Sequence, residues 1–127
     1  MSREIEFRAW HRKYKYIARV ADISFNRGVV NLNGADISKI EEIELMQWTG
    51  LKDRNGVKIF EGDIVKCKVC TLDNETYEID DIGEVVYDDD CCTYLINFNE
   101  GCIRLSSAWD LEVIGNIYAN KELLEDE

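Results

Sequence analysis

The chain of 127 residues contains no proline, a single histidine, and no apolar run near the roughly 20 residues of a membrane-spanning helix. Its first residues, Met1 to Arg8, mix both signs of charge and lack the apolar stretch of a secretory signal. We therefore expect a cytoplasmic protein without a membrane segment. A cysteine nucleophile needs a base, and the only histidine, His11, lies in a predicted polar turn where we expect it to be solvated. We accordingly expect no enzymatic activity and no cofactor.

Charge is present in quantity but is unevenly distributed. The formal net charge is −11, from 15 Lys and Arg against 26 Asp and Glu. Residues 1–27 hold seven basic and three acidic residues, a net of +4, and the rest of the chain holds eight and twenty-three, a net of −15. A field of that sign repels phosphate backbones and attracts basic proteins. Nucleic acid is therefore an unfavourable partner, and a basic protein is a favourable one.

Short β-type runs separated by turn residues dominate the sequence. Segment 35–44 is ambiguous, because its isoleucines at three-residue spacing also fit one face of a short helix. Residues 121–126 follow Asn120 and predict a short C-terminal helix. Gly115, inside the last predicted strand, indicates a bulge or a close approach of another segment. The predicted strands are residues 4–10, 15–21, 23–25, 29–32, 45–48, 57–60, 64–70, 83–87, 92–98, 103–106 and 111–118.

The strand pattern predicts a mainly-β fold with one compact unit. The short predicted strands with tight turns over residues 57–118 favour a small closed barrel, which removes exposed sheet edges. We expect an N-terminal β region at residues 1–44, built on a β-hairpin and packed on a barrel at residues 45–127. Tyrosines on these strands, including Tyr87 and Tyr94, are expected in the core or on a sheet face.

Three stretches of sequence resemble the YopX-like family of phage and prophage proteins. They are Arg3–Trp10, the central stretch from Leu45 through Gly56 to Val65, and Leu111–Tyr118 with the residues that follow. The resemblance spans nearly the whole chain. It implies an SH3-like barrel with an added N-terminal β region, together with a phage or prophage origin. It implies no particular activity and supplies no catalytic residues.

The central stretch has two interpretations. Trp48, Thr49, Lys52 and Asp53 gather near one predicted loop, and loops on rigid scaffolds often form binding surfaces. Backbone geometry explains the same stretch, because glycines recur where tight turns need positive φ and Asp53 can bond its own turn. We favour turn geometry and keep these four residues as a candidate binding site.

Four of the five cysteines form a candidate metal site. Cys67, Cys70, Cys91 and Cys92 supply enough thiols for tetrahedral zinc. The second pair is adjacent in sequence, and the first pair lies on a predicted strand, where positions i and i+3 face opposite sides. Small buried hydrophobic residues are therefore the favoured interpretation.

Two charged segments allow further alternatives. Residues 73–90 hold nine carboxylates and no lysine or arginine, which is typical of a solvated loop with charged strand faces. The same segment is compatible with a basic partner, with mimicry of a phosphate surface, or with calcium, although its spacing does not match an EF-hand loop. Residues 10–16 interleave aromatic and basic side chains as single-strand binders do, and they also fit a plain hairpin.

We predict a non-enzymatic protein-interaction module that binds another protein or a second copy of itself. The first alternative is a nucleic-acid-associated barrel that uses residues 8–19 as its basic strip. The second alternative is a small metal-binding protein built on the cysteines.

Overall fold

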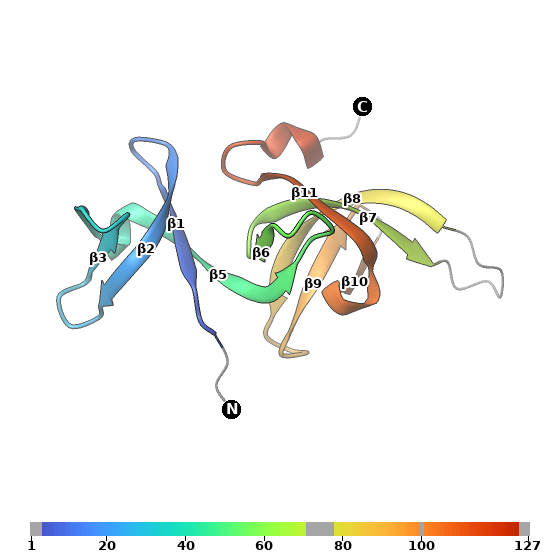
Figure 1. Cartoon of the computed structure of the whole chain (residues 1–127), viewed down its shortest axis with the longest axis horizontal. Helices are drawn as coiled ribbons and strands as arrows, with labels where there is room; N and C mark the ends of the chain where they lie inside the picture. Colours follow the sequence, from blue (N-terminus) through green and yellow to red (C-terminus); the bar gives the residue numbers. More distant parts are fainter. Residues whose placement is uncertain (1–3, 71–77, 100, 125–127) are drawn as a thin grey trace.

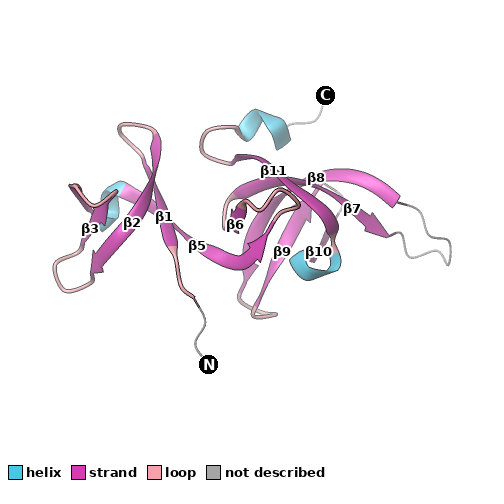
Figure 2. Ribbon diagram, in the orientation of Figure 1, coloured by secondary structure: helices cyan, strands magenta, loops and turns pink. Residues whose placement is uncertain are grey.

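Two antiparallel sheets make up the computed structural model, which describes residues 4–70, 78–99 and 101–124 (Figures 1 and 2). The first sheet has the strand order β4-β3-β2-β1-β5-β6. Its strands are β1 (Phe7–His11), β2 (Tyr16–Ser24), β3 (Val29–Leu32), β4 (Asp36–Lys39), β5 (Ile43–Lys52) and β6 (Lys58–Phe60). The second sheet has the order β10-β9-β8-β7-β11. Its strands are β7 (Asp63–Cys70), β8 (Glu78–Asp88), β9 (Thr93–Phe98), β10 (Gly101–Arg104) and β11 (Trp109–Asn116).

The predicted mainly-β class is confirmed, and so is the close approach at Gly115. A Cβ atom there would lie 2.7 Å from Asn120 Oδ1, and the pairing of β11 with β7 shifts register beside it. Among the described residues, strand pairing leaves β10 and β11 at the edges of the second sheet and does not close it. The SH3-like barrel therefore stays a prediction, as does the division at residues 44 and 45, which β5 crosses.

The ambiguous segment at residues 35–44 folds as strand, short turn and strand. β4 pairs with β3, the 3₁₀ turn η1 occupies Ile40–Glu42, and β5 begins at Ile43. Its length is too short for an isolated helix to be stable, and pairing with β3 satisfies the backbone instead. Ile37 is consequently 64% exposed rather than on a buried helical face. The described part of the predicted C-terminal helix is a 3₁₀ turn, η3 (Lys121–Leu124), and residues 125 and 126 lie outside the described residues.

Two separate hydrophobic clusters divide the molecule into two lobes. We call β1–β4, η1 and the first half of β5 the N-terminal lobe, and the remainder the C-terminal lobe; Figure 1 shows β5 running from one to the other. The fully buried residues of the N-terminal cluster are Ala9, Ala18, Val30, Leu32 and Ile43. Those of the C-terminal cluster are Ile59, Val65, Cys67, Val85, Ile96 and Leu105.

A buried ion pair joins the two lobes. Arg8 of β1 donates from Nη2 to Asp63 Oδ1 at 2.5 Å, and Asp63 Oδ2 accepts the Phe60 N–H at 2.7 Å. The Asp63 side chain is 1% exposed, and the Arg8 guanidinium also lies 4.7 Å from the centre of the Phe60 ring. Burial raises the pKa of Asp63 above its ordinary value, and the Arg8 charge with the Phe60 N–H limits the rise.

The backbone at this junction requires glycine at position 62. Gly62 has φ +84°, and a Cβ atom there would lie 3.2 Å from Met46 Sδ of the N-terminal lobe. Its N–H donates to Val85 O, and its carbonyl accepts the Ile117 N–H. The lobes also meet where Trp10 stacks on Tyr118, with ring centres 5.9 Å apart. The junction is therefore packed and hydrogen-bonded rather than a free linker.

Replacing Arg8 with methionine is expected to destabilise the protein strongly. The variant keeps most of the apolar stem but leaves the Asp63 carboxylate buried without its counter-charge, which costs about 3–5 kcal/mol. Urea unfolding at neutral pH measures the loss. Arg12→Met is the matched control, because the Arg12–Glu44 pair is exposed and such pairs contribute at most about 1 kcal/mol. Equal losses in the two variants would contradict the central role of the Arg8–Asp63 pair.

The penalty of Arg8→Met is expected to shrink as pH falls. Without Arg8 the folded-state pKa of Asp63 rises further above the unfolded value of about 3.9. The folded variant then takes up a proton before the unfolded chain does, so its free energy of unfolding rises relative to wild type as pH falls through the folded pKa. Parallel urea titrations of both proteins from neutral to mildly acidic pH measure this, and a pH-independent difference would contradict it.

Candidate functional site

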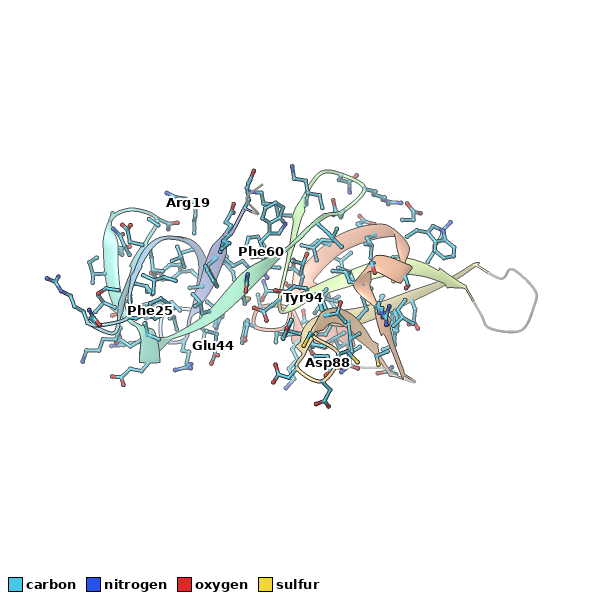
Figure 3. All side chains as sticks on the ribbon, turned by 90° about the horizontal axis from the view of Figure 1, so that it is seen from below. Arg19, Phe25, Glu44, Phe60, Asp88 and Tyr94 are labelled. Atoms are coloured by element: carbon cyan, nitrogen blue, oxygen red, sulfur yellow. The ribbon has the colours of Figure 1, made fainter. Side chains whose placement is uncertain are left out.

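A surface groove of about 420 Å³ lies beside the point where β5 passes between the lobes. We call it the acidic groove. One wall is β5 with the turn after β6, and the other is the end of the β8–β9 hairpin. Figure 3 shows Tyr94 of that hairpin near the middle of the molecule. The lining residues are Glu4, Gln47, Trp48, Thr49, Gly50, Glu61, Tyr87, Cys92, Thr93 and Tyr94.

Internal hydrogen bonds hold the β5 wall in place. Trp48 donates from Nε1 to Leu51 O at 2.9 Å, and Thr49 donates from Oγ1 to Ile59 O at 2.7 Å. Thr49 Oγ1 also accepts the Leu51 N–H. The polar atoms of Trp48 and Thr49 are therefore engaged with the chain's own backbone. The indole ring of Trp48 is the part of this wall that can contact a ligand in the groove.

Two tyrosines form the opposite wall. Tyr87 of β8 and Tyr94 of β9 are cross-strand partners and meet edge to face, with ring centres 5.2 Å apart. Such pairs place large apolar area on a rigid hairpin. Tyr87 is 45% exposed. Its pKa is raised by partial desolvation and by neighbouring Cys92, Asp89 and Asp88, so its hydroxyl stays protonated at neutral pH.

The charged side chains that line the groove are acidic. Among the described residues, Glu4 and Glu61 line it and no lysine or arginine does, although Lys58 lies over the Trp48 ring at its edge. Glu61 Oε1 accepts the Gln47 N–H at 2.8 Å, which fixes that carboxylate against β5. The hairpin turn beside the groove continues the charge with three consecutive aspartates at positions 88–90, of which Asp89 and Asp90 are exposed. The arrangement favours a cation.

The chain's own Lys58 shows how the edge of this groove binds an ammonium group. Lys58 Nζ lies 4.6 Å from the centre of the Trp48 ring and forms an ion pair with Glu6. An aromatic face together with a carboxylate is a general way to hold an alkylammonium ion. The groove offers the same chemistry on its open side, with Glu61 and the tyrosine pair.

The four residues of the candidate binding loop do not all line the acidic groove. Trp48 and Thr49 line the acidic groove, whereas Lys52 and Asp53 do not. Asp53 is 7% exposed and closes its own turn, since Oδ1 accepts the N–H groups of Asn55 and Val57. Its Oδ2 accepts the Val113 N–H of β11 at 2.9 Å. Turn geometry therefore accounts for Asp53.

The electrostatics of Asp53 follow from those bonds. Burial acts to raise its pKa, but the three backbone donors and nearby Arg54 outweigh burial and hold the pKa below its ordinary value. Arg54 in turn pairs with Asp110 and Glu112 on β11. This end of the loop is a structural clamp on β11.

The cysteines lie in different environments. Cys67 is buried in the C-terminal cluster, as expected of a small hydrophobic residue, whereas Cys91 and Cys92 are exposed at the β8–β9 turn, contrary to that expectation. The difference arises because β7 runs through the core and the turn does not. The side chain of Cys70 lies outside the described residues. Among those described, no group of three or more His, Cys, Asp or Glu is placed to hold a metal ion.

The basic strip at residues 8–19 has its first members already engaged. Arg8 is in the buried ion pair, Trp10 stacks on Tyr118, and Arg12 pairs with Glu44. His11 corrects the expectation of a solvated turn residue. It is 4% exposed, stacks on Tyr16, and accepts the Tyr14 N–H at Nδ1, because its strand position faces the N-terminal cluster.

Sequence reasoning missed half of the acidic groove. Tyr87 and Tyr94 were expected to be core or sheet-face residues, and Glu4 and Glu61 carried no local signal. The groove forms only where the first sheet meets the hairpin of the second. The two tyrosines end up opposite each other because the β8–β9 hairpin pairs Tyr87 with Tyr94.

Asp53→Asn is expected to destabilise the protein by about 1–3 kcal/mol, because its amide group presents a donor to a backbone donor. The contribution of the ionised carboxylate is present above the unfolded pKa of about 3.9 and is lost as pH falls through the lower folded pKa. The gap between wild type and variant, measured by urea unfolding, should therefore close in acid. Asp22→Asn at an exposed position is the control, and a gap that widens in acid would contradict the assignment.

Comparisons with known proteins agree with this two-sheet architecture. A model of the YopX protein family matches residues 6–125. The crystal structure of protein EF1440 from Enterococcus faecalis superposes with a TM-score of 0.68 at 26% identity, covering 98% of this chain and 100% of that one. No curated protein matches the sequence. Among the described residues, no helix is long and apolar enough to cross a membrane. With its family model matched over nearly its whole length, the chain belongs to the YopX protein family.

Proposed function

We propose that the protein is a non-enzymatic protein-interaction module that binds a basic polypeptide segment in the acidic groove. The observation that carries the proposal is the composition of the groove, which joins Trp48, Tyr87 and Tyr94 to carboxylates and, among the described residues, has no basic residue in its lining. Aromatic residues dominate binding hot spots, and carboxylates select the sign of the partner. A lysine or arginine side chain satisfies both.

The position of the groove supports this function. Its walls come from β5 and from a tight hairpin, and both belong to rigid sheets rather than to long loops. A preformed site loses little conformational entropy on binding, so a modest contact area can still give measurable affinity. The chain's negative charge beyond residue 27 adds long-range attraction for a basic partner.

The wider setting of the proposal is a phage- or prophage-encoded protein in the bacterial cytoplasm, with the C-terminal lobe as an SH3-like barrel. Family membership and the mainly-β fold support this setting. A basic partner also suits the described part of the chain, where carboxylates crowd the β8–β9 turn.

A peptide-binding measurement tests the proposal. A labelled peptide of alternating lysine and glycine should bind wild type, as followed by fluorescence anisotropy, and a glutamate–glycine peptide should not. Tyr87→Ser and Glu4→Lys should each weaken binding by roughly tenfold, about 1.4 kcal/mol, since they remove a cation–π partner and reverse a charge at the groove. Asp36→Lys makes the same charge change on β4, outside the groove lining, and should leave the affinity unchanged.

Three results would overturn the proposal. The first is the absence of lysine-peptide binding at low ionic strength. The second is an equal loss in Asp36→Lys and Glu4→Lys, which would show that only overall charge matters. The third is tighter binding of single-stranded DNA than of the peptide, with the steep salt dependence of phosphate contacts, which would favour the nucleic-acid alternative.

A further inference from the structure

The chain itself presents a basic segment at the turn between β1 and β2. Residues 12–15 of this turn hold three cations, Arg12, Lys13 and Lys15, and all are exposed. Arg12 is engaged with Glu44, while among the described residues no ion pair involves Lys13 or Lys15. Tyr14, between the two lysines, is 66% exposed. We call residues 12–15 the basic tip.

The basic tip is preformed. Lys15 N–H donates to His11 O at 2.8 Å, and Tyr14 N–H donates to His11 Nδ1 at 3.3 Å. The buried His11 ring stacks on Tyr16 and contacts Tyr14, so the turn is anchored to the N-terminal cluster. A tip held in one conformation loses little entropy when it inserts into a groove. It presents lysine and tyrosine side chains to the solvent.

The acidic groove is complementary to the basic tip in charge and in chemistry. The tip offers two ammonium groups outside the ion pairs of the described residues, with Lys13 Nζ 5.3 Å from the centre of the exposed Tyr14 ring. The groove offers Glu4 and Glu61, the aspartates beside it, and three aromatic side chains. Lys58 over the Trp48 ring shows that an ammonium ion is accepted at this edge.

The tip cannot fill the groove of its own molecule. In Figure 1 the β1–β2 turn lies at the top of the N-terminal lobe, and the β8–β9 turn lies at the bottom of the C-terminal lobe. The buried Arg8–Asp63 pair and the Trp10–Tyr118 stack fix the two lobes against each other. Any contact between tip and groove must therefore join two molecules.

From this arrangement we infer that the acidic groove binds the basic tip of a second copy, so that copies associate head to tail. The inference rests on the proposed function, since it names the basic segment that the groove takes. A bound pair still presents one free tip and one free groove, so the contact is heterologous and generates chains rather than a closed pair unless a ring forms. A hairpin tip in a groove is a small interface, typical of weak and reversible association.

The affinity of one copy for another through this contact depends on ionic strength. Each copy carries a net charge of −11, so whole molecules repel one another at very low salt. At about 0.15 M salt the screening length is about 8 Å, which suppresses the long-range repulsion and leaves the close tip–groove charges in place. Association should therefore be measurable at intermediate salt and should weaken again near about 1 M, where the screening length is about 3 Å.

Sedimentation velocity on two complementary variants tests the inference. Wild type at about 0.15 M salt should show a weight-average mass that rises with concentration. The double variant Lys13→Glu, Lys15→Glu has an altered tip and an intact groove, and Glu4→Lys, Tyr87→Ser has an altered groove and an intact tip. Each variant alone should stay monomeric. An equimolar mixture should form a dimer and stop there, because only one intact tip meets one intact groove.

A matched control separates site-specific contact from net charge. Arg27→Glu with Lys121→Glu makes the same charge change as the tip variant, at exposed positions outside the tip and the groove. It should associate as wild type does. Circular dichroism melts confirm that the variants are folded.

Each outcome decides between the proposals. Wild type that stays monomeric at every concentration overturns head-to-tail association, and so does a mixture that stays monomeric or a tip variant that associates like wild type. If wild type fails to associate with itself but still binds the lysine peptide, the proposed function stands and only the identity of the partner is rejected. If it binds neither the peptide nor itself, both proposals fall.

Discussion

The buried contact between Arg8 and Asp63 is the constraint on which the rest of the structure depends. A carboxylate that is almost fully buried is tolerated only with a counter-charge and hydrogen bonds. Here the counter-charge comes from Arg8 of the N-terminal lobe, and a backbone hydrogen bond comes from Phe60 of the C-terminal lobe. The Arg8 side chain extends from the N-terminal lobe to Asp63, which is the first residue of β7. Asp63 directly follows the turn that needs glycine at position 62. This pair, together with the Trp10–Tyr118 stack, fixes the relative position of the lobes.

The acidic groove is a consequence of that placement. β5 contributes to both lobes, so fixing the lobes brings its middle section beside the β8–β9 hairpin. Neither wall would form a site alone, because Trp48 and Tyr94 belong to different sheets. The groove therefore lies at a junction between packed units, which is where binding sites commonly occur.

The pKa values of two carboxylates, Asp63 and Asp53, are shifted in opposite directions by the balance between burial and polar partners. Asp63 has its pKa raised because burial outweighs its partners, whereas Asp53 has its pKa lowered because three backbone donors and a neighbouring arginine outweigh burial. Both hold chain segments that are far apart in sequence. The carboxylates of the groove, by contrast, remain available to a partner because solvent reaches them. Structural roles and the proposed binding role are thus divided among acidic residues that the sequence presents alike.

The sequence by itself determined the mainly-β class, most strand positions, the turns and the close approach at Gly115, since alternation of apolar residues and turn chemistry are local. It also predicted that Asp53 stabilises its own turn, because the hydrogen bonds of such an aspartate involve only nearby residues. The tertiary structure alone decided the burial of His11, the exposure of Cys91 and Cys92, and the strand assignment of residues 36–39 and 43–44 in the ambiguous segment. It alone brought Glu4, Trp48 and Tyr94 into one groove. Those outcomes depend on which strands pair and how two sheets meet, and long-range pairing leaves no pattern within a single stretch of chain.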